Sequence, residues 1–253
     1  ADAGDQRVDL GPGVVEANDA RVVAGTGLRN ALTGDPVTVD TMFQIGSITK
    51  MYTTTLVMQL VDRGQVRLEA PIAEYLPELQ LAGDPDLGDI TIEMLLTHTS
   101  GIEGDCFFDT GRGDDAIEKI IPRLAEIGLI HQPGRAWSYC NTGFVLCGRI
   151  IEKVTGLPWR EALSRFVVEP LGTVGPLTLL DDVISHPVAL GHMPGADGAW
   201  SAAPLKTMPW SQVSAGSRPY GTAADLLAFA EMHLNRGRSA NGNQVLAADT
   251  VAA

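Results

Sequence analysis

The sequence predicts an α+β fold in which an antiparallel sheet flanked by helices brackets an inserted all-helical lobe. Three observations support this prediction. Segments that read as strands gather toward the two ends of the chain, and helical segments fill its middle. The chain has 253 residues with 45% hydrophobic content, enough for a substantial core.

The N-terminal elements read as strands followed by one long helix. Residues 14–16 and 21–26 are predicted to form a hairpin around Asn18-Asp19, and a loop follows. A short strand is expected at 42–45 and a helix at 47–63, whose apolar run indicates a buried helix.

Helix and loop segments dominate the rest of the chain. Helices are predicted at 92–97, 114–127, 141–154, 158–168 (with Pro158 just inside its start), 222–236 and from 245 onward, and 172–208 reads as irregular. The helix at 114–127 places Ile117, Ile120, Ile121 and Leu124 on one face. We expect residues 1–65 to carry the first part of the sheet and the 47–63 helix. Residues 66–210 should form the helical lobe, and residues 211–253 should return toward the sheet.

Charge and composition limit the partners and cofactors that the protein is expected to have. A net charge of −13 argues against nucleic acid and anionic membrane surfaces as partners. No apolar run is long enough to span a membrane. The first residues show no basic or apolar leader, and an exported chain whose leader had been removed would look the same, so the compartment stays open. The three cysteines are expected to be buried thiols, and no Cys/His spacing indicates a metal site or cofactor.

The first chemical motif is Ser47-Ile48-Thr49-Lys50, at the start of the 47–63 helix. Residues three apart share a helix face, so the Lys50 amine is expected beside the Ser47 hydroxyl. A serine becomes a nucleophile when a neighbour takes its proton. The N–H groups of a first helical turn also face any negative charge that develops there. By itself, the spacing is equally met by an N-cap serine followed by an exposed lysine.

A second motif, Tyr139-Cys140-Asn141, follows a turn-rich segment and leads into the 141–154 helix. Two residues that are two apart in an extended segment project to the same side. A phenol with an unperturbed pKa of about 10 acts as a base near neutral pH only beside a cation, and Lys50 is the candidate cation. Tyr139 as a loop anchor and Asn141 as a helix N-cap are the structural alternatives.

Together, these motifs resemble the serine β-lactamase/penicillin-binding protein superfamily, in the branch of class C β-lactamases, D-alanyl-D-alanine carboxypeptidases and related esterases. The resemblance covers roughly residues 35–235. Its matching stretches are DTMFQIGSITK (40–50), IEMLLTHTSGI (92–102), PGRAWSYCNTGF (133–144), IIEKVTG (150–156), EPLG (169–172) and, more weakly, SAG (214–216) with TAADL (222–226).

The resemblance implies a nucleophile at Ser47, a proton-shuttling partner at Lys50, a base at Tyr139 and a substrate contact at Asn141. In the family, a third motif, Lys/His-x-Gly on a later strand, supplies one oxyanion-hole N–H. No such motif follows the 222–236 helix, and we read the earlier 192–195 and 206–208 triplets as loop. We therefore expect further polypeptide, a continuation or a second chain, to complete the sheet.

Other polar and aromatic residues near these motifs have weaker signals. We expect His98 to be structural, in a polar run that ends the 92–97 helix. Trp137 and Tyr220 are equally compatible with a cleft and with packing. The acidic loop at 103–115 lies where the family's cleft-edge loop runs, and its aspartates lack the spacing of a calcium loop.

The sequence thus predicts a serine hydrolase that forms an acyl-enzyme on an amide or ester, of the D-amino-acid peptidase or esterase type, with a small-molecule or peptide-like substrate and no cofactor. A true β-lactamase is the alternative within this class. A catalytically silent binding or sensor protein with an acylatable serine is the alternative from another class.

Overall fold

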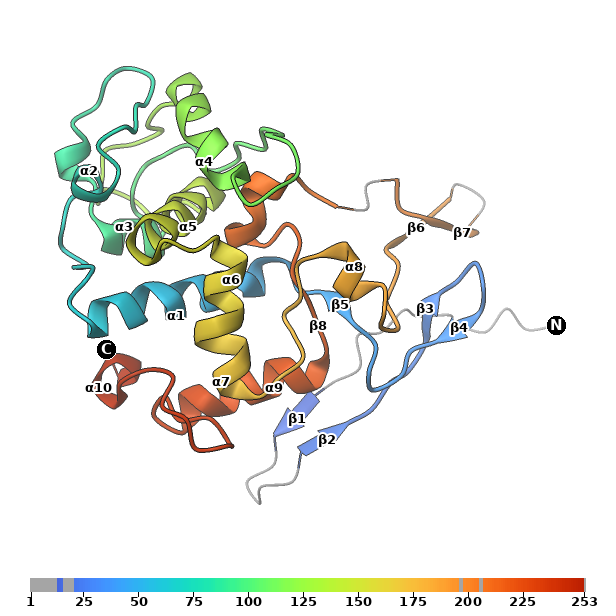
Figure 1. Cartoon of the computed structure of the whole chain (residues 1–253). Coiled ribbons are helices and arrows are strands. Elements are labelled where there is room, and N and C mark those ends of the chain that lie inside the picture. Colours follow the sequence, from blue (N-terminus) through green and yellow to red (C-terminus); the bar gives the residue numbers. More distant parts are fainter. Residues whose placement is uncertain (1–12, 16–20, 196–197, 205–206, 253) are drawn as a thin grey trace.

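The computed structural model describes residues 13–15, 21–195, 198–204 and 207–252. It consists of helices and short antiparallel strand pairs (Figure 1), which confirms the α+β prediction. The helices are α1 (Thr49–Asp62), α2 (Ile72–Tyr75), α3 (Ile92–Leu96), α4 (Ala116–Ile120), α5 (Asn141–Thr155), α6 (Trp159–Leu163), α7 (Glu169–Leu171), α8 (Leu180–Val183), α9 (Ala223–Leu234) and α10 (Ala248–Ala252). Four 3₁₀ turns, η1 (Gly46–Ile48), η2 (Leu87–Asp89), η3 (Ile121–Glu126) and η5 (Trp210–Ala215), and one π turn, η4 (Ser164–Val168), join them.

The strands form antiparallel pairs: β1 (Gly13–Val15) with β2 (Arg21–Val23), β3 (Leu28–Asn30) with β4 (Asp35–Pro36), β5 (Phe43–Gln44) with β8 (Tyr220–Gly221), and β6 (His192–Pro194) with β7 (Trp200–Ala202). β1 and β2 correspond to the predicted N-terminal hairpin, whose turn at Asn18-Asp19 lies outside the described residues. β5 lies within the strand predicted at 42–45.

Two hairpins were not predicted. The β3–β4 pair replaces an expected loop, and the β6–β7 pair lies in the segment read as irregular, so reading 192–195 as loop was wrong. His192 Nε2 accepts a hydrogen bond from Ala31 N at 3.0 Å, and Leu190 N donates to Arg29 O at 2.8 Å. These hydrogen bonds join the two hairpins across about 160 positions of the chain, and no local pattern encodes such a contact.

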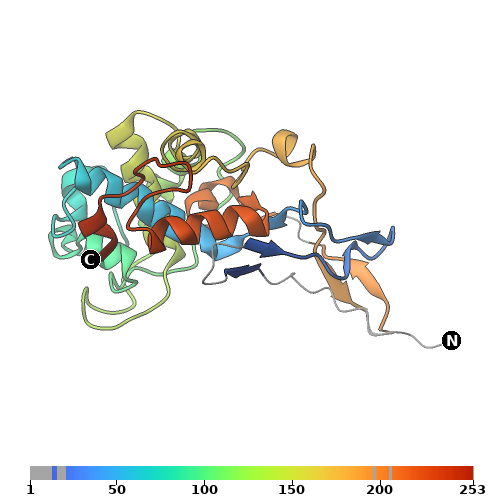
Figure 2. The ribbon, with the colours of Figure 1, turned by 90° about the horizontal axis from the view of Figure 1, so that it is seen from below.

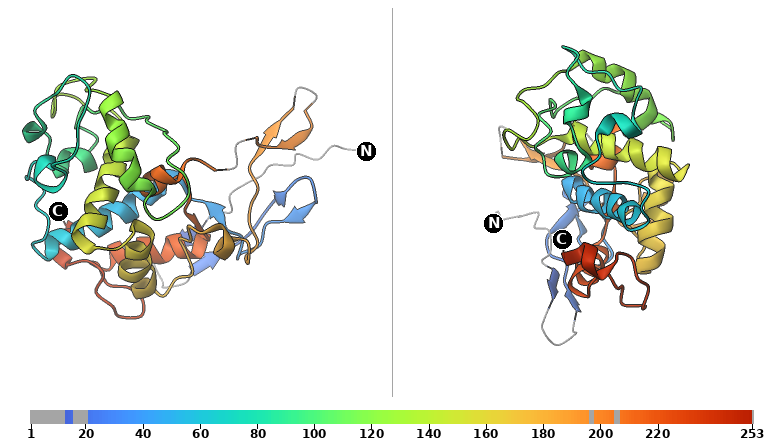
Figure 3. Two further views of the ribbon diagram at one scale, coloured as in Figure 1. Left: turned by 45° about the horizontal axis from the view of Figure 1, so that its top comes forward. Right: turned by 90° about the vertical axis from the view of Figure 1, so that its left-hand side faces the viewer.

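α1 is the central helix of the molecule. Figure 3 shows it between the helices α2–α5 and the β1–β2 pair, and Figure 2 shows α9 alongside that pair. α1 contacts α5, α6 and η5, and this explains why it is buried on several faces, as predicted. Its buried residues include Tyr52, Thr53, Leu56, Val57 and Leu60. Together, η1 and α1 fill the helix predicted at 47–63.

Two predicted helices are interrupted. The 114–127 segment forms α4 and then η3, because Pro122 has no N–H to donate to Glu118 O in an α-helix. Its predicted apolar face is nevertheless buried. The 158–168 segment forms α6 and then the π turn η4, with Pro158 at the N-cap rather than inside the helix. Within the described residues, no helix has the length and apolarity needed to cross a membrane. The division of the chain at residues 66 and 211 stays a prediction.

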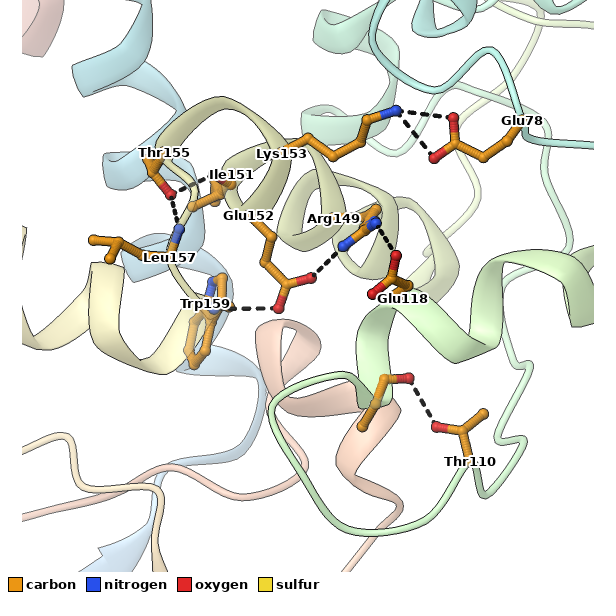
Figure 4. Close-up of polar contacts among 11 residues, drawn as sticks. Glu78, Thr110, Glu118, Arg149, Ile151, Glu152, Lys153, Thr155, Leu157 and Trp159 are labelled. Atoms are coloured by element: carbon orange, nitrogen blue, oxygen red, sulfur yellow. Dashed lines mark hydrogen bonds and ion pairs between the residues drawn. The ribbon is translucent and has the colours of Figure 1, made fainter.

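A polar network fixes α5 against its neighbours (Figure 4). Arg149 Nη2 donates to Glu118 at 2.6 Å, and its Nη1 donates to Glu152 Oε2 at 3.3 Å. Glu152 Oε1 accepts from Trp159 N at 3.2 Å, so a buried carboxylate caps the start of α6. Lys153 pairs with Glu78 at 2.9 Å. α5 therefore holds its orientation through the side chains of Glu118 and Glu78 and the backbone N–H of Trp159.

We expect the stability that Glu152 contributes to fall as pH rises. Burial is the largest cause that raises the pKa of this carboxyl to about 7. Because the folded-state pKa of Glu152 lies above its unfolded value, the contribution of this residue to the free energy of unfolding is complete below about pH 4.3. It is lost as pH rises through 7. In urea unfolding measured from pH 5 to pH 8, the free energy of unfolding of the wild type should fall by about 2–3 kcal/mol relative to that of Glu152→Gln. Glu118→Gln, which changes an exposed partner of the same arginine, should keep the wild-type slope. Parallel pH curves for the wild type and Glu152→Gln would contradict this account.

Candidate active site

Ser47 lies in the turn between β5 and α1. Pairing of β5 with β8 and a hydrogen bond from Ile45 N to Pro219 O (2.9 Å) place this turn against the 215–221 segment. The approach is close, because a Cβ added to Gly216 would lie 2.2 Å from Gly46 O, and Gly216 has φ +122°. Ser47 is exposed and caps neither η1 nor α1, so the N-cap alternative is wrong.

Lys50 brings together three acceptors in a buried position. Its side chain is one helical turn from Ser47, as the spacing predicts, and only 5% of the residue is exposed. Nζ donates to Ser47 Oγ at 3.3 Å, to Asn141 Oδ1 at 2.7 Å and to Ala215 O at 2.8 Å. An ammonium group has three N–H donors, so these contacts satisfy a protonated lysine completely.

Asn141 is the first residue of α5 rather than its cap. The cap is Cys140, whose Sγ accepts from Gly143 N at 3.2 Å. The Asn141 amide lies between a group that only donates and a group that only accepts: its Oδ1 faces Lys50, and its Nδ2 donates to Asp105 Oδ1 at 2.9 Å. These two partners together fix which way the amide points.

Tyr139 lies beside Lys50 with the face of its ring toward the amine. Nζ is 4.7 Å from the ring centroid, so the predicted cation is close to the phenol. Tyr139 is 41% exposed, and no hydrogen bond joins its hydroxyl to the described residues. The structure thus brings Ser47, Lys50, Tyr139 and Asn141 together, while leaving the phenol accessible.

His98 packs against the Tyr139 ring and binds the backbone of the 139–141 segment. It follows α3 with φ +61°, and its Nδ1 accepts from Cys140 N at 3.0 Å, so the ring proton lies on Nε2. Its ring is 4.6 Å from that of Tyr139. Burial first, and then the Lys50 charge, lower the pKa of His98, which keeps the ring neutral at neutral pH. These contacts agree with the structural role predicted for His98.

Trp137 and Tyr220, whose roles the sequence left undecided, both lie near the site. Trp137 is 66% exposed, with its ring 6.5 Å from that of Tyr139. Tyr220 belongs to β8 and pairs with Gln44, so its backbone helps to hold the turn before Ser47. The three cysteines are buried free thiols, as expected.

A pocket of about 180 Å³ opens at Ser47. Phe107 and Met208 form the apolar part of its lining, and Asn141, Gln212 and Ser217 form the polar part. The pocket is lined by Gly46, Ser47, Phe107, Asn141, Met208, Gln212, Ala215, Gly216 and Ser217. Such a mixture of apolar wall and few polar groups is typical of small-molecule sites.

Sequence reasoning missed three acceptor groups at the site. The Ala215 carbonyl accepts from Lys50, and the neighbouring Ser214 carbonyl accepts from Thr53 Oγ1 at 2.7 Å. The weak SAG match marked this segment without indicating that its carbonyls face α1. Asp105 contacts Asn141 across 36 positions and had been read only as part of an acidic loop.

Comparison with known proteins agrees with this geometry. The sequence profile of the family described as Beta-lactamase matches residues 3–252. Penicillin-binding protein 4 of Amycolatopsis lactamdurans is 40% identical over 231 residues, covering 90% of this chain and 60% of that protein. Esterase EstB of Burkholderia gladioli is 34% identical over 58% of this chain and 41% of its own length.

Solved structures show the same fold. The octameric penicillin-binding protein homologue from Pyrococcus abyssi superposes with a TM-score of 0.76 at 26% identity, covering 91% of this chain and 52% of that one. The chain therefore spans about 40–60% of the length of these relatives. With its profile match over nearly every residue, the chain belongs to the β-lactamase family.

Proposed function

We propose that this chain carries the acylation machinery of a serine hydrolase that cleaves an amide or ester through an acyl-enzyme, of the D-amino-acid peptidase or esterase type. The observation that carries the proposal is the hydrogen bond from the buried Lys50 Nζ to the exposed Ser47 Oγ, beside a pocket. The similarity to an esterase and to a penicillin-binding protein supports this class of chemistry.

Ser47 Oγ attacks the carbonyl carbon. Tyr139 acts as the general base together with Lys50, whose Nζ lies 4.7 Å from the centroid of the Tyr139 ring. This pair accepts the Ser47 proton and returns it to the leaving group, and water then hydrolyses the acyl-enzyme. The N–H of Ser47, in the first turn before α1, donates to the oxyanion in this mechanism. Further polypeptide that completes the sheet and supplies the second donor stays a prediction.

The test uses the full-length protein, with p-nitrophenyl butyrate and a fluorescent penicillin followed by absorbance and intact mass. We expect steady turnover of the ester through an acyl-enzyme. Rapid turnover of the penicillin would favour a true β-lactamase. A penicillin adduct that persists without ester turnover would favour an acylatable binding protein, and this alternative is supported by the similarity to a penicillin-binding protein. Absence of both adduct and turnover would overturn the proposal.

A further inference from the structure

The 105–110 segment, in the loop before α4, presents one aromatic ring to the pocket. Exposed residues alternate along it with buried or half-buried ones, as in an extended chain. Cys106 is 4% exposed, and Phe108 packs against the core, with the guanidinium of Arg123 4.3 Å from its ring. Phe107, between them, is 42% exposed and lines the pocket at Ser47. The alternation therefore turns the Phe107 ring toward the pocket and its two neighbours toward the interior.

Two neighbouring side chains of η5 hold this segment by its carbonyl groups. Ser211 Oγ donates to Phe108 O at 2.6 Å. Gln212 Nε2 donates to Cys106 O at 2.7 Å. Both donors belong to buried residues, and burial shields these hydrogen bonds from water. Because the two carbonyls lie on either side of Phe107, the hydrogen bonds fix the backbone that carries its ring.

η5 is also connected to the proposed catalytic residues. It packs against both α1 and α5. The Ala215 carbonyl, at the end of η5, accepts from Lys50 Nζ at 2.8 Å, and Lys50 donates to Ser47 Oγ. One short 3₁₀ turn thus holds the amine beside the nucleophile at one end and the segment that carries Phe107 at the other. The position of the Phe107 ring relative to Ser47 is therefore set by η5.

The pocket suits the acyl part of a substrate. In the proposed mechanism Tyr139 returns a proton to the leaving group, and the pocket's lining does not include Tyr139. The leaving group is therefore expected on the Tyr139 side of Ser47, which leaves the pocket to the acyl group. A cavity of about 150 Å³ is large enough for benzene. The pocket, at about 180 Å³, accordingly has room for a phenyl-sized group against Phe107 and Met208.

We propose that Phe107 is a specificity residue for phenyl-sized acyl groups and that Ser211 and Gln212 are the positioning residues that hold its ring in place. The proposal rests on the proposed function and names the acyl group within it. A ring that is already held loses little conformational freedom when a substrate binds. Two aromatic rings in contact also gain more than their buried area alone provides. Loss of either hydrogen bond would leave a buried carbonyl without its partner, and the segment would shift to restore one.

The test compares two p-nitrophenyl esters, the phenylacetate and the acetate, which share a leaving group and differ by a phenyl ring in the acyl group. The readout is the ratio of kcat/KM for the phenylacetate to that for the acetate, measured with the full-length protein, because a loss of active enzyme cancels in this ratio. The wild type should prefer the phenylacetate, and Phe107→Ala should lower the ratio about tenfold. Ser211→Ala, which changes no residue of the pocket's lining, should lower it about threefold to tenfold.

Gln212 lines the pocket itself, so Gln212→Leu is measured alone and combined with Phe107→Ala. If Gln212 acts by holding Phe107, the single variant should lower the ratio about threefold to tenfold. The double variant should then match Phe107→Ala within about twofold, because the ring that Gln212 positions is already gone. An equal loss in both backgrounds would mean that Gln212 contacts the acyl group directly, and would overturn its positioning role.

Gln59→Leu is the matched control. Gln59 is buried, as Gln212 is, and its Nε2 donates to Phe166 O and Val245 O at 2.8 Å. The variant thus removes a similar buried amide at a position outside the pocket's lining, and its ratio should stay within about twofold of the wild type.

Three further results would contradict the proposal. A loss of the ratio in Gln59→Leu as large as in Gln212→Leu, or unchanged ratios in Ser211→Ala and Gln212→Leu, would overturn the positioning role. A wild type without preference for the phenylacetate, or a ratio that Phe107→Ala leaves unchanged, would overturn the specificity role of Phe107. No turnover of either ester by the wild type would overturn the proposed function and this inference with it.

Discussion

Replacement of Ser47 by alanine is expected to abolish covalent labelling by a serine-directed phosphonate or a β-lactam. Ester turnover should fall by ~10³-fold or more, because the acyl-enzyme is expected to form on the Ser47 hydroxyl. Ser47 Oγ is the hydroxyl that faces the Lys50 ammonium at 3.3 Å and opens onto the pocket. Mass spectrometry of peptides from the labelled protein should locate the adduct on Ser47.

Ser217→Ala is the control for this experiment, since Ser217 lines the same pocket and its hydroxyl donates to Pro209 O at 2.7 Å. An adduct should still form on Ser47 in that variant. Labelling of Ser217, or of any other serine in the wild type, would refute the assignment of the nucleophile. The alanine variant should unfold like the wild type, because Ser47 is exposed and caps no helix.

Replacement of Tyr139 by phenylalanine is expected to lower kcat by ~10²–10⁴, the range for loss of a general base. The substitution removes one oxygen and keeps the ring that lies 4.7 Å from Lys50 Nζ and 4.6 Å from the His98 ring. The hydroxyl has no hydrogen bond to the described residues, so the fold should change little. Burst and steady-state rates with an ester substrate, together with an unfolding curve, would separate chemistry from stability.

Trp137→Phe provides the comparison, because it shortens an exposed aromatic side chain in the same segment without removing a candidate base. Its kcat should stay within a few-fold of the wild type. If Tyr139→Phe turned over substrate as fast as the wild type, Tyr139 would be scaffold and Lys50 would act alone.

The local parts of the site could be predicted because they depend on short spacings. Ser47 and Lys50 are one helical turn apart, and a helix converts this spacing into a contact whatever surrounds it. Thr222 and Asp225 likewise form a capping box at the start of α9, close to the predicted boundary. Pro122 shows where periodicity misled: the apolar pattern continued through it, but the missing N–H ended α4.

The sequence by itself thus determined the long helices α1, α5 and α9, the pairing of Ser47 with Lys50 and the candidate roles of Tyr139 and Asn141. Only the tertiary structure decided that the Ala215 carbonyl accepts from Lys50 and that Asp105 orients the Asn141 amide. Every residue has a carbonyl, so its use as an acceptor leaves no signature in the sequence. The Asp105 contact joins segments 36 positions apart, and only the path of the chain decides which loop carboxylate meets which amide.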